Sequence, residues 1–139
     1  MLRIINLLSQ KNHYLEKFYS VNESGLLEFS RGQFDHLETF YQNREKILEM
    51  IKYLDHEIET SETDGTGPFS DENKQEMREA LAIKDEYVSR ILSQDLQILS
   101  CIESAKSEII RELQEIKRTK KAVGSYKSRT PSRRLDEEA

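Results

Sequence analysis

The chain has 139 residues, enough for one modest domain, with 36% hydrophobic residues, 34% charged residues and no tryptophan. With only five Gly and two Pro residues, this composition is typical of elongated helices and argues against a compact α/β enzyme. The net charge of −5 combines +8 on residues 117–134, −3 on residues 136–138 and therefore −10 on residues 1–116. We expect the basic segment to contact a partner.

The cellular compartment is indicated by the cysteine content and by the lengths of the apolar runs. A single cysteine, Cys101, excludes an intrachain disulfide and fits a reducing environment. The N-terminal apolar run is broken by Ser9–Asn12, which leaves it too short for a signal peptide. No stretch approaches the roughly 18 apolar residues of a membrane helix, so we expect a cytoplasmic protein without membrane insertion.

A first helix is predicted over about residues 2–30. Its apolar seam follows alternating steps of three and four residues through Ile5, Leu8, Asn12, Leu15, Tyr19, Asn22, Leu26 and Phe29. Asn12 and Asn22 interrupt this seam, and Gly25 weakens the helix by about 1 kcal/mol relative to Ala. Gly32 can adopt the left-handed conformation that ends a helix.

A second helix is predicted over about residues 33–61. Its seam runs through Leu37, Phe40, Arg44, Ile47, Ile51, Leu54 and Ile58, and Phe34, Tyr41, Leu48 and Met50 broaden the apolar stripe. The polar segment Thr60–Pro68, which contains two Gly residues and one Pro, is the clear loop of the chain.

A third helix is predicted over about residues 71–123, capped by Ser70 and ended by Gly124-Ser125. Its ladder comprises Leu81, Lys84, Val88, Ile91, Asp95, Ile98, Ile102, Ala105, Ile109, Glu112, Ile116, Thr119 and Val123, and most of these residues are apolar. A second stripe comprises Leu92, Leu96, Leu99, Ile110 and Leu113. We expect the first two helices to cover both stripes as far as Leu99.

The predicted fold is all-α: an elongated antiparallel bundle of three helices, with a long C-terminal helix, in one domain over residues 1–126. Residues 127–139 are expected to form a mobile basic and acidic tail. A continuous third helix would be roughly 80 Å long, against some 45 Å for each of the others. Its end should overhang them and leave Ile102, Ile109, Ile110, Leu113 and Ile116 partly uncovered, unless a bend or a dimer covers them.

Catalytic and cofactor motifs are missing from the sequence. The three His residues, at positions 13, 36 and 56, lack the i, i+4 spacing of a helical zinc site. Gly65-Thr66-Gly67-Pro68 lacks the lysine and the preceding strand of a phosphate-binding loop. We therefore predict no catalytic residue, no metal and no cofactor, and a protein that is not an enzyme.

Two segments resemble flagellar export chaperones of the FliT type. The segment Phe29-Ser30-Arg31-Gly32-Gln33-Phe34-Asp35-His36-Leu37 is similar to the junction between the first two helices of that family. The helix from Ile91 to Leu113, which runs into Lys121–Tyr126, is similar to its last helix. The two matches cover roughly residues 1–128, and FlgN-type chaperones share the same architecture.

The resemblance implies a cytoplasmic chaperone that binds the C-terminal helical region of a secreted filament-cap or hook–filament junction protein. It further implies delivery of this client to the export ATPase and the export gate, with Tyr126 as a candidate gate contact. In such a protein the C-terminal helix covers the client groove until it is displaced.

The partner-binding residues are predicted from this resemblance together with the apolar ladder. They are Leu99, Ile102, Ile109, Leu113 and Ile116, with Tyr41 and Leu48 facing them and Tyr126 at the gate. Two alternatives stay open. One is a homodimeric coiled coil with a structural, adaptor or regulatory role; the other is a nucleic-acid binder acting through its basic segment, although Tyr126 is the only aromatic residue there.

Overall fold

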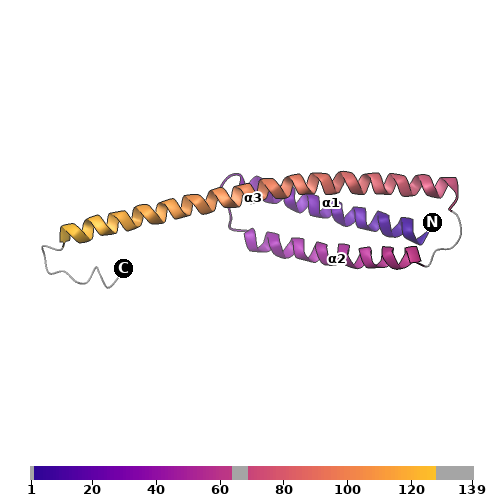
Figure 1. Cartoon of the computed structure of the whole chain (residues 1–139), viewed down its shortest axis with the longest axis horizontal. Coiled ribbons are helices and arrows are strands. Elements are labelled where there is room, and N and C mark those ends of the chain that lie inside the picture. Colours follow the sequence, from indigo (N-terminus) through magenta and orange to yellow (C-terminus); the bar gives the residue numbers. More distant parts are fainter. Residues whose placement is uncertain (1, 64–68, 128–139) are drawn as a thin grey trace. The chain divides into compact units, whose positions relative to one another are not determined.

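The computed structural model describes residues 2–63 and 69–127, without the side chains of residues 62, 63 and 125–127. This part of the chain contains three helices and no strand: α1 (Arg3–Phe29), α2 (Leu37–Thr63) and α3 (Asp71–Lys127) (Figure 1). The predicted all-α fold is confirmed. Most of the predicted loop, at residues 64–68, and the predicted tail, at 128–139, lie outside the described residues.

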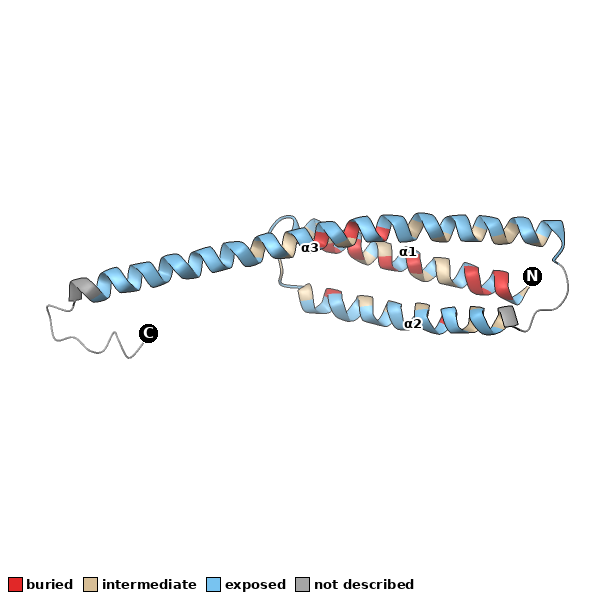
Figure 2. Cartoon of the chain, in the orientation of Figure 1, coloured by how far each residue is buried: buried red, intermediate tan, exposed pale blue. Residues whose placement is uncertain are grey.

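The chain divides into two units, Met1–Cys101 (unit 1) and Ile102–Ala139 (unit 2), whereas the sequence pattern groups residues 1–126 together. In unit 1, α1 is the central helix, and the buried residues gather along it (Figure 2). They are Ile4, Ile5, Leu7, Leu8, Leu15, Phe18, Asn22, Gly25 and Phe29. These residues occupy a wide part of the helix circumference because α1 packs against both α2 and α3.

Two apolar clusters hold the three helices of unit 1 together. Near the start of α1, Ile4, Ile5 and Leu8 pack against Ile58 of α2 and against Met77 and Ala80 of α3. Further along, Leu15, Phe18 and Ile91 pack together with Ile47, Ile51, Tyr19 and Tyr87. Each fully buried aliphatic or aromatic side chain contributes about 1.5–3 kcal/mol, so both clusters stabilise the packing of the three helices.

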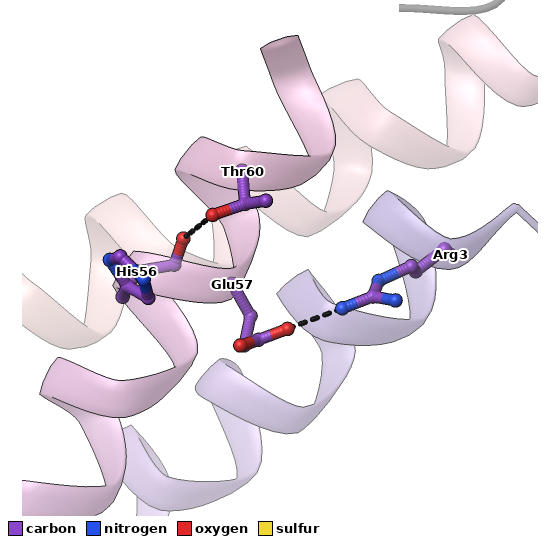
Figure 3. Close-up of polar contacts among 4 residues, drawn as sticks. All are labelled: Arg3, His56, Glu57 and Thr60. Carbon is purple, nitrogen blue, oxygen red and sulfur yellow. Dashed lines mark hydrogen bonds and ion pairs between the residues drawn. The ribbon is translucent and has the colours of Figure 1, made fainter. Parts of the chain in front are cut away.

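Ion pairs line the outer edge between α1 and α2. Arg3 of α1 reaches Glu57 of α2, and within α2 the hydroxyl of Thr60 donates a hydrogen bond to the His56 carbonyl at 3.0 Å (Figure 3). Eight residues further along α1, the Nζ atom of Lys11 lies 2.6 Å from Oδ1 of Asp55 on α2. Pairs of this kind near solvent contribute at most about 1 kcal/mol each, so they orient the two helices more than they stabilise them.

A hydrogen-bonded turn around Gly32 ends α1. Gly32 has a φ of 77°, its N–H donates to the Phe29 carbonyl at 3.0 Å, and the Gln33 N–H donates to the Glu28 carbonyl at 3.0 Å. This is the Schellman arrangement, and it confirms the expected role of Gly32. The Phe34 ring then stacks on Phe29 with centroids 5.3 Å apart. Residues 33–36 are occupied by this reversal, so α2 begins at Leu37 and not near residue 33 as predicted.

Replacing Gly32 with alanine should lower the free energy of unfolding by about 1 kcal/mol. A Cβ at this position would meet no atom within 4 Å, so the penalty comes from the left-handed backbone alone. Urea unfolding followed by circular dichroism measures the change. Gly32→Asn is the control and should lose less, because asparagine tolerates this conformation better than alanine. Equal stability of the alanine variant and the wild type would contradict this explanation.

The face of α3 that packs in unit 1 differs slightly from the predicted ladder. Leu81 and Val88 are exposed, while their neighbours Ala80 and Tyr87 pack inward. Two hydrogen bonds set this rotation. Asn12 donates to the Ala80 carbonyl at 2.9 Å, and Gln94 donates to the Tyr19 carbonyl at 3.2 Å.

The start of α3 agrees with the prediction, and its end does not. The Asn73 N–H donates to the Ser70 hydroxyl at 3.1 Å, which confirms the predicted N-cap. At the other end the helix continues through Gly124 to Lys127, so the predicted end at residue 123 is wrong. A single glycine costs about 1 kcal/mol in a helix, and nothing in the adjacent backbone makes it a stop.

Candidate partner-binding surfaces

An open groove of about 280 Å³ lies between α2 and α3 in unit 1. Its lining residues are Leu15 and Phe18 of α1, Arg44, Leu48 and Ile51 of α2, and Val88, Ile91, Leu92 and Asp95 of α3. The residues from α1 are buried and form its floor, while α2 and α3 supply the two walls. Because most of its lining residues are apolar and it is open to solvent, the α2–α3 groove can receive apolar side chains of a macromolecular partner.

The walls of the α2–α3 groove carry uncovered apolar side chains. Leu48 is 44% exposed and Leu92 is 60% exposed. Tyr41 lies seven residues before Leu48 on the same face of α2, and Leu99 lies seven residues after Leu92 on α3; both are exposed. Because α2 and α3 run antiparallel, Tyr41 and Leu99 lie toward the same end of the groove. The apolar surface therefore extends beyond the groove itself.

The α3 wall is also poor in charge. Between Ile91 and Ile102 the only charged residue is Asp95, in a chain where 34% of residues are charged. Apolar residues and uncharged Ser and Gln residues make up the rest of this stretch. Depletion of charge is the compositional mark of the core of a protein–protein interface. This part of α3 has the composition of a binding surface and not of a solvated helix face.

A polar triad from all three helices closes the groove at Asp95. Asn22 of α1 is fully buried and donates from Nδ2 to Asp95 Oδ1 at 3.0 Å. Arg44 of α2 places Nη2 3.3 Å from the same oxygen. The guanidinium of Arg44 also lies over the rings of Phe18 and Phe40, 4.7 and 5.1 Å from their centroids. The sole charge of the α3 wall is thus paired, and it ties α2 and α3 to the central helix.

The structure corrects the expectation that the first two helices cover the second stripe. Leu92, Leu96 and Leu99 are all exposed in unit 1. The reason is geometric, since α1 and α2 meet α3 along the single face that carries Tyr87, Ile91 and Ile98. The leucine stripe lies at the side of this face, so α1 and α2 leave more than half of each of its side chains uncovered.

A second apolar surface lies on unit 2. Ile109, Ile110, Leu113, Ile116 and Val123 are 44–56% exposed, and Ile102 is half-buried. We call the residues at 102, 109, 116 and 123, with Leu113, the unit 2 seam. They share one side of α3 because they recur at steps of three, four and seven residues.

The predicted site residues fall into three groups. Leu48 lines the α2–α3 groove, and Tyr41 and Leu99 flank it in unit 1. Ile102, Ile109, Leu113 and Ile116 belong to unit 2. Tyr126 lies in α3, but its side chain is outside the described residues, so its role stays a prediction. The prediction omitted Leu92, although the charge-poor stretch around it is visible in the sequence.

Across the described residues, no group of three or more His, Cys, Asp or Glu side chains is arranged to hold a metal ion. None of the helices over the same residues has an apolar stretch long enough to cross a membrane. A comparison with protein-family models, curated proteins and solved structures found no match. The fold and its surfaces therefore define the class: an all-α bundle with two uncovered apolar surfaces.

Proposed function

We propose that this protein is a cytoplasmic chaperone of flagellar type III export. Its client is the C-terminal helical region of a secreted filament-cap or hook–filament junction protein, and the client binds in the α2–α3 groove as an amphipathic helix. The observation that carries the proposal is the pair of uncovered apolar walls, Leu48 on one side and Leu92 on the other, above a closed core.

The shape of the groove favours a helix as its occupant. Two antiparallel helices with a third beneath them form a long groove, and a helix added there completes a four-helix arrangement. An amphipathic helix placed there would bury its apolar face against Leu48, Leu92 and the neighbouring leucines. Its polar face would stay in water. Such binding shields the assembly surface of the client before export.

The resemblance of the 29–37 and 91–126 segments to FliT-type chaperones supplies the identity of the client and the delivery step. Delivery to the export ATPase and the export gate follows as part of the same proposal, with Tyr126 as the gate contact. The FlgN-type chaperones share this architecture, and the identity of the bound client separates the two types.

Leu48→Asp and Leu92→Asp should each lower the affinity for the client at least about tenfold, because a charge would be buried against an apolar helix face. The probes are the purified C-terminal helical regions of the cap and junction proteins of the same flagellar system. Isothermal titration with the full-length chain measures the affinity. Circular dichroism should stay unchanged, since both leucines are exposed in the free protein.

Leu27→Asp is the matched control. Leu27 is similarly exposed, at 58%, but it lies on α1 and does not line the groove. It should bind the client as the wild type does. The proposal fails if the wild-type chain binds none of these regions, or if all three aspartate variants weaken binding alike.

The homodimeric coiled coil is the second candidate function, and the regular seven-residue spacing of the unit 2 seam favours it. A structural coiled coil would remain dimeric at low concentration and would show no affinity for amphipathic helices. Light scattering over a dilution series, together with the titrations above, separates the two candidates.

A further inference from the structure

We infer that unit 2 binds a second copy of this chain, and that the two copies of α3 pair antiparallel over residues 102–120. The inference does not rest on the proposed function, because its core layers from Ile102 to Lys120 lie in unit 2 and not in the α2–α3 groove. It starts from the unit 2 seam, where Ile102, Ile109, Ile116 and Val123 recur at every seventh residue. That period keeps one side of a helix against a partner helix over three heptads.

The residues that share this side decide the direction of the partner. Lys106, Leu113 and Lys120 stand three residues before Ile109, Ile116 and Val123, respectively. They occupy the other core position of each heptad. In a parallel pair each core residue faces its own copy, so Lys106 would meet Lys106 and Lys120 would meet Lys120. In an antiparallel pair the two kinds of core position face each other. Each lysine then lies against an isoleucine, along which its stem can pack.

One antiparallel register gives every core residue from Ile102 to Lys120 a partner, and it sets Val123 level with Leu99 of the other copy. It places Ile109 against Leu113, Lys106 against Ile116 and Ile102 against Lys120 of the other copy. By symmetry each of these layers occurs twice. The exposed fractions of Ile109 and Leu113, 56% and 53%, show that the central layer is open to receive its partner.

Charge complementarity supports the same direction. Residues 102–116 contain four acidic and two basic residues, a net charge of −2, whereas residues 117–123 contain four basic residues and no acid, a net charge of +4. A parallel pair would bring the two +4 ends together. The antiparallel register sets them apart and places Lys117 beside Glu103 of the other copy, twice per dimer.

The unfavourable feature of this register is Glu112, which faces its own copy at the centre. We therefore expect Glu112→Gln to strengthen the dimer. A dimer of three heptads with lysines in its core should be weak and dependent on concentration, in contrast with the persistent dimer of a structural coiled coil.

Charge reversal in the full-length chain tests the direction by sedimentation equilibrium. Lys117→Glu should raise the dimer dissociation constant about tenfold, because it replaces two attractions by two repulsions. Adding Glu103→Lys should restore the wild-type value, and adding Glu112→Lys should not, because Glu112 faces Lys117 only in a parallel pair. Ile109→Asp should abolish the dimer and leave the titration of the client into the α2–α3 groove unchanged.

Spin labels give an independent measurement. Ser100→Cys in a Cys101→Ser background puts one label on each chain at an exposed position next to unit 2. In the antiparallel register, residue 100 lies level with residue 122 of the other copy, so the labels stand roughly 33 Å apart along the axis. A chain that stays monomeric at millimolar concentration, or a label distance well below 33 Å, would overturn the inference. So would a dissociation constant that Lys117→Glu leaves unchanged, or one that Glu112→Lys restores to the wild-type value.

Discussion

Asp95→Leu should lower the free energy of unfolding of unit 1 by about 2 kcal/mol, even though it adds an apolar residue. The substitution leaves the Arg44 guanidinium without its carboxylate, and it leaves the buried Nδ2 of Asn22 without an acceptor. An unpaired buried donor carries the full penalty of its lost hydration. Urea unfolding monitored by circular dichroism measures the effect.

Two further variants sharpen this prediction. Asp85→Leu is the matched control on the same helix, because the Asp85 carboxylate pairs with its neighbour Lys84 and its side chain is 73% exposed. It should change stability by less than about 0.5 kcal/mol. Replacing the whole triad, with Asn22→Leu, Arg44→Met and Asp95→Leu together, should recover most of the loss. A triple variant as unstable as the sum of its parts would show that the triad is not the cause.

Gly25→Ala should destabilise unit 1 by about 2 kcal/mol, although alanine favours a helix by about 1 kcal/mol over glycine. A Cβ on Gly25 would lie 2.6 and 2.8 Å from two ring atoms of Phe40 and 3.1 Å from Phe29. The Phe40 ring cannot move away freely, since it is buried, meets Phe29 edge-on at 5.1 Å and carries the Arg44 guanidinium. Thermal unfolding at fixed protein concentration measures the loss.

Gly124→Ala is the control for this substitution. It makes the same chemical change in a helix, but a Cβ there would meet nothing within 4 Å. It should leave the unfolding of unit 1 unchanged and slow the amide hydrogen exchange of the last turns of α3 by adding helix propensity. A stabilising Gly25→Ala would mean that Phe40 relaxes at little cost, which would contradict the close packing of α1 against α2.

The two asparagines on the α1 seam can be located from the sequence, but their hydrogen-bond partners are known only from the structure. In the sequence, Asn12 and Asn22 are interruptions in an apolar seam. In the structure, each donates a hydrogen bond to α3, to the Ala80 carbonyl and to Asp95. Their Oδ1 atoms are buried and have no partner among the described residues. These bonds are long-range, so no local rule could assign their partners.

The role of Gly32 could be predicted from the sequence, whereas the role of Gly25 could not. Both glycines suggest weak points of a helix, and the sequence places the helix end correctly at Gly32, where the Schellman turn forms. Gly25 lies inside α1, where its missing side chain makes room for the Phe40 ring of α2. The propensity of a residue cannot indicate a neighbour that arrives from a separate helix.

The sequence by itself determines that the chain is helical, where α1 ends, that Ser70 caps α3 and that α3 carries more apolar surface than a small bundle can cover. Periodicity, caps and turns report these features because each depends on residues within one or two turns of helix. Only the tertiary structure decides which face of α3 packs inward, that the leucine stripe with Leu92 stays open, and that Asp95 joins three helices. Those outcomes depend on which side chains meet across helices, and that is settled by packing and long-range hydrogen bonds.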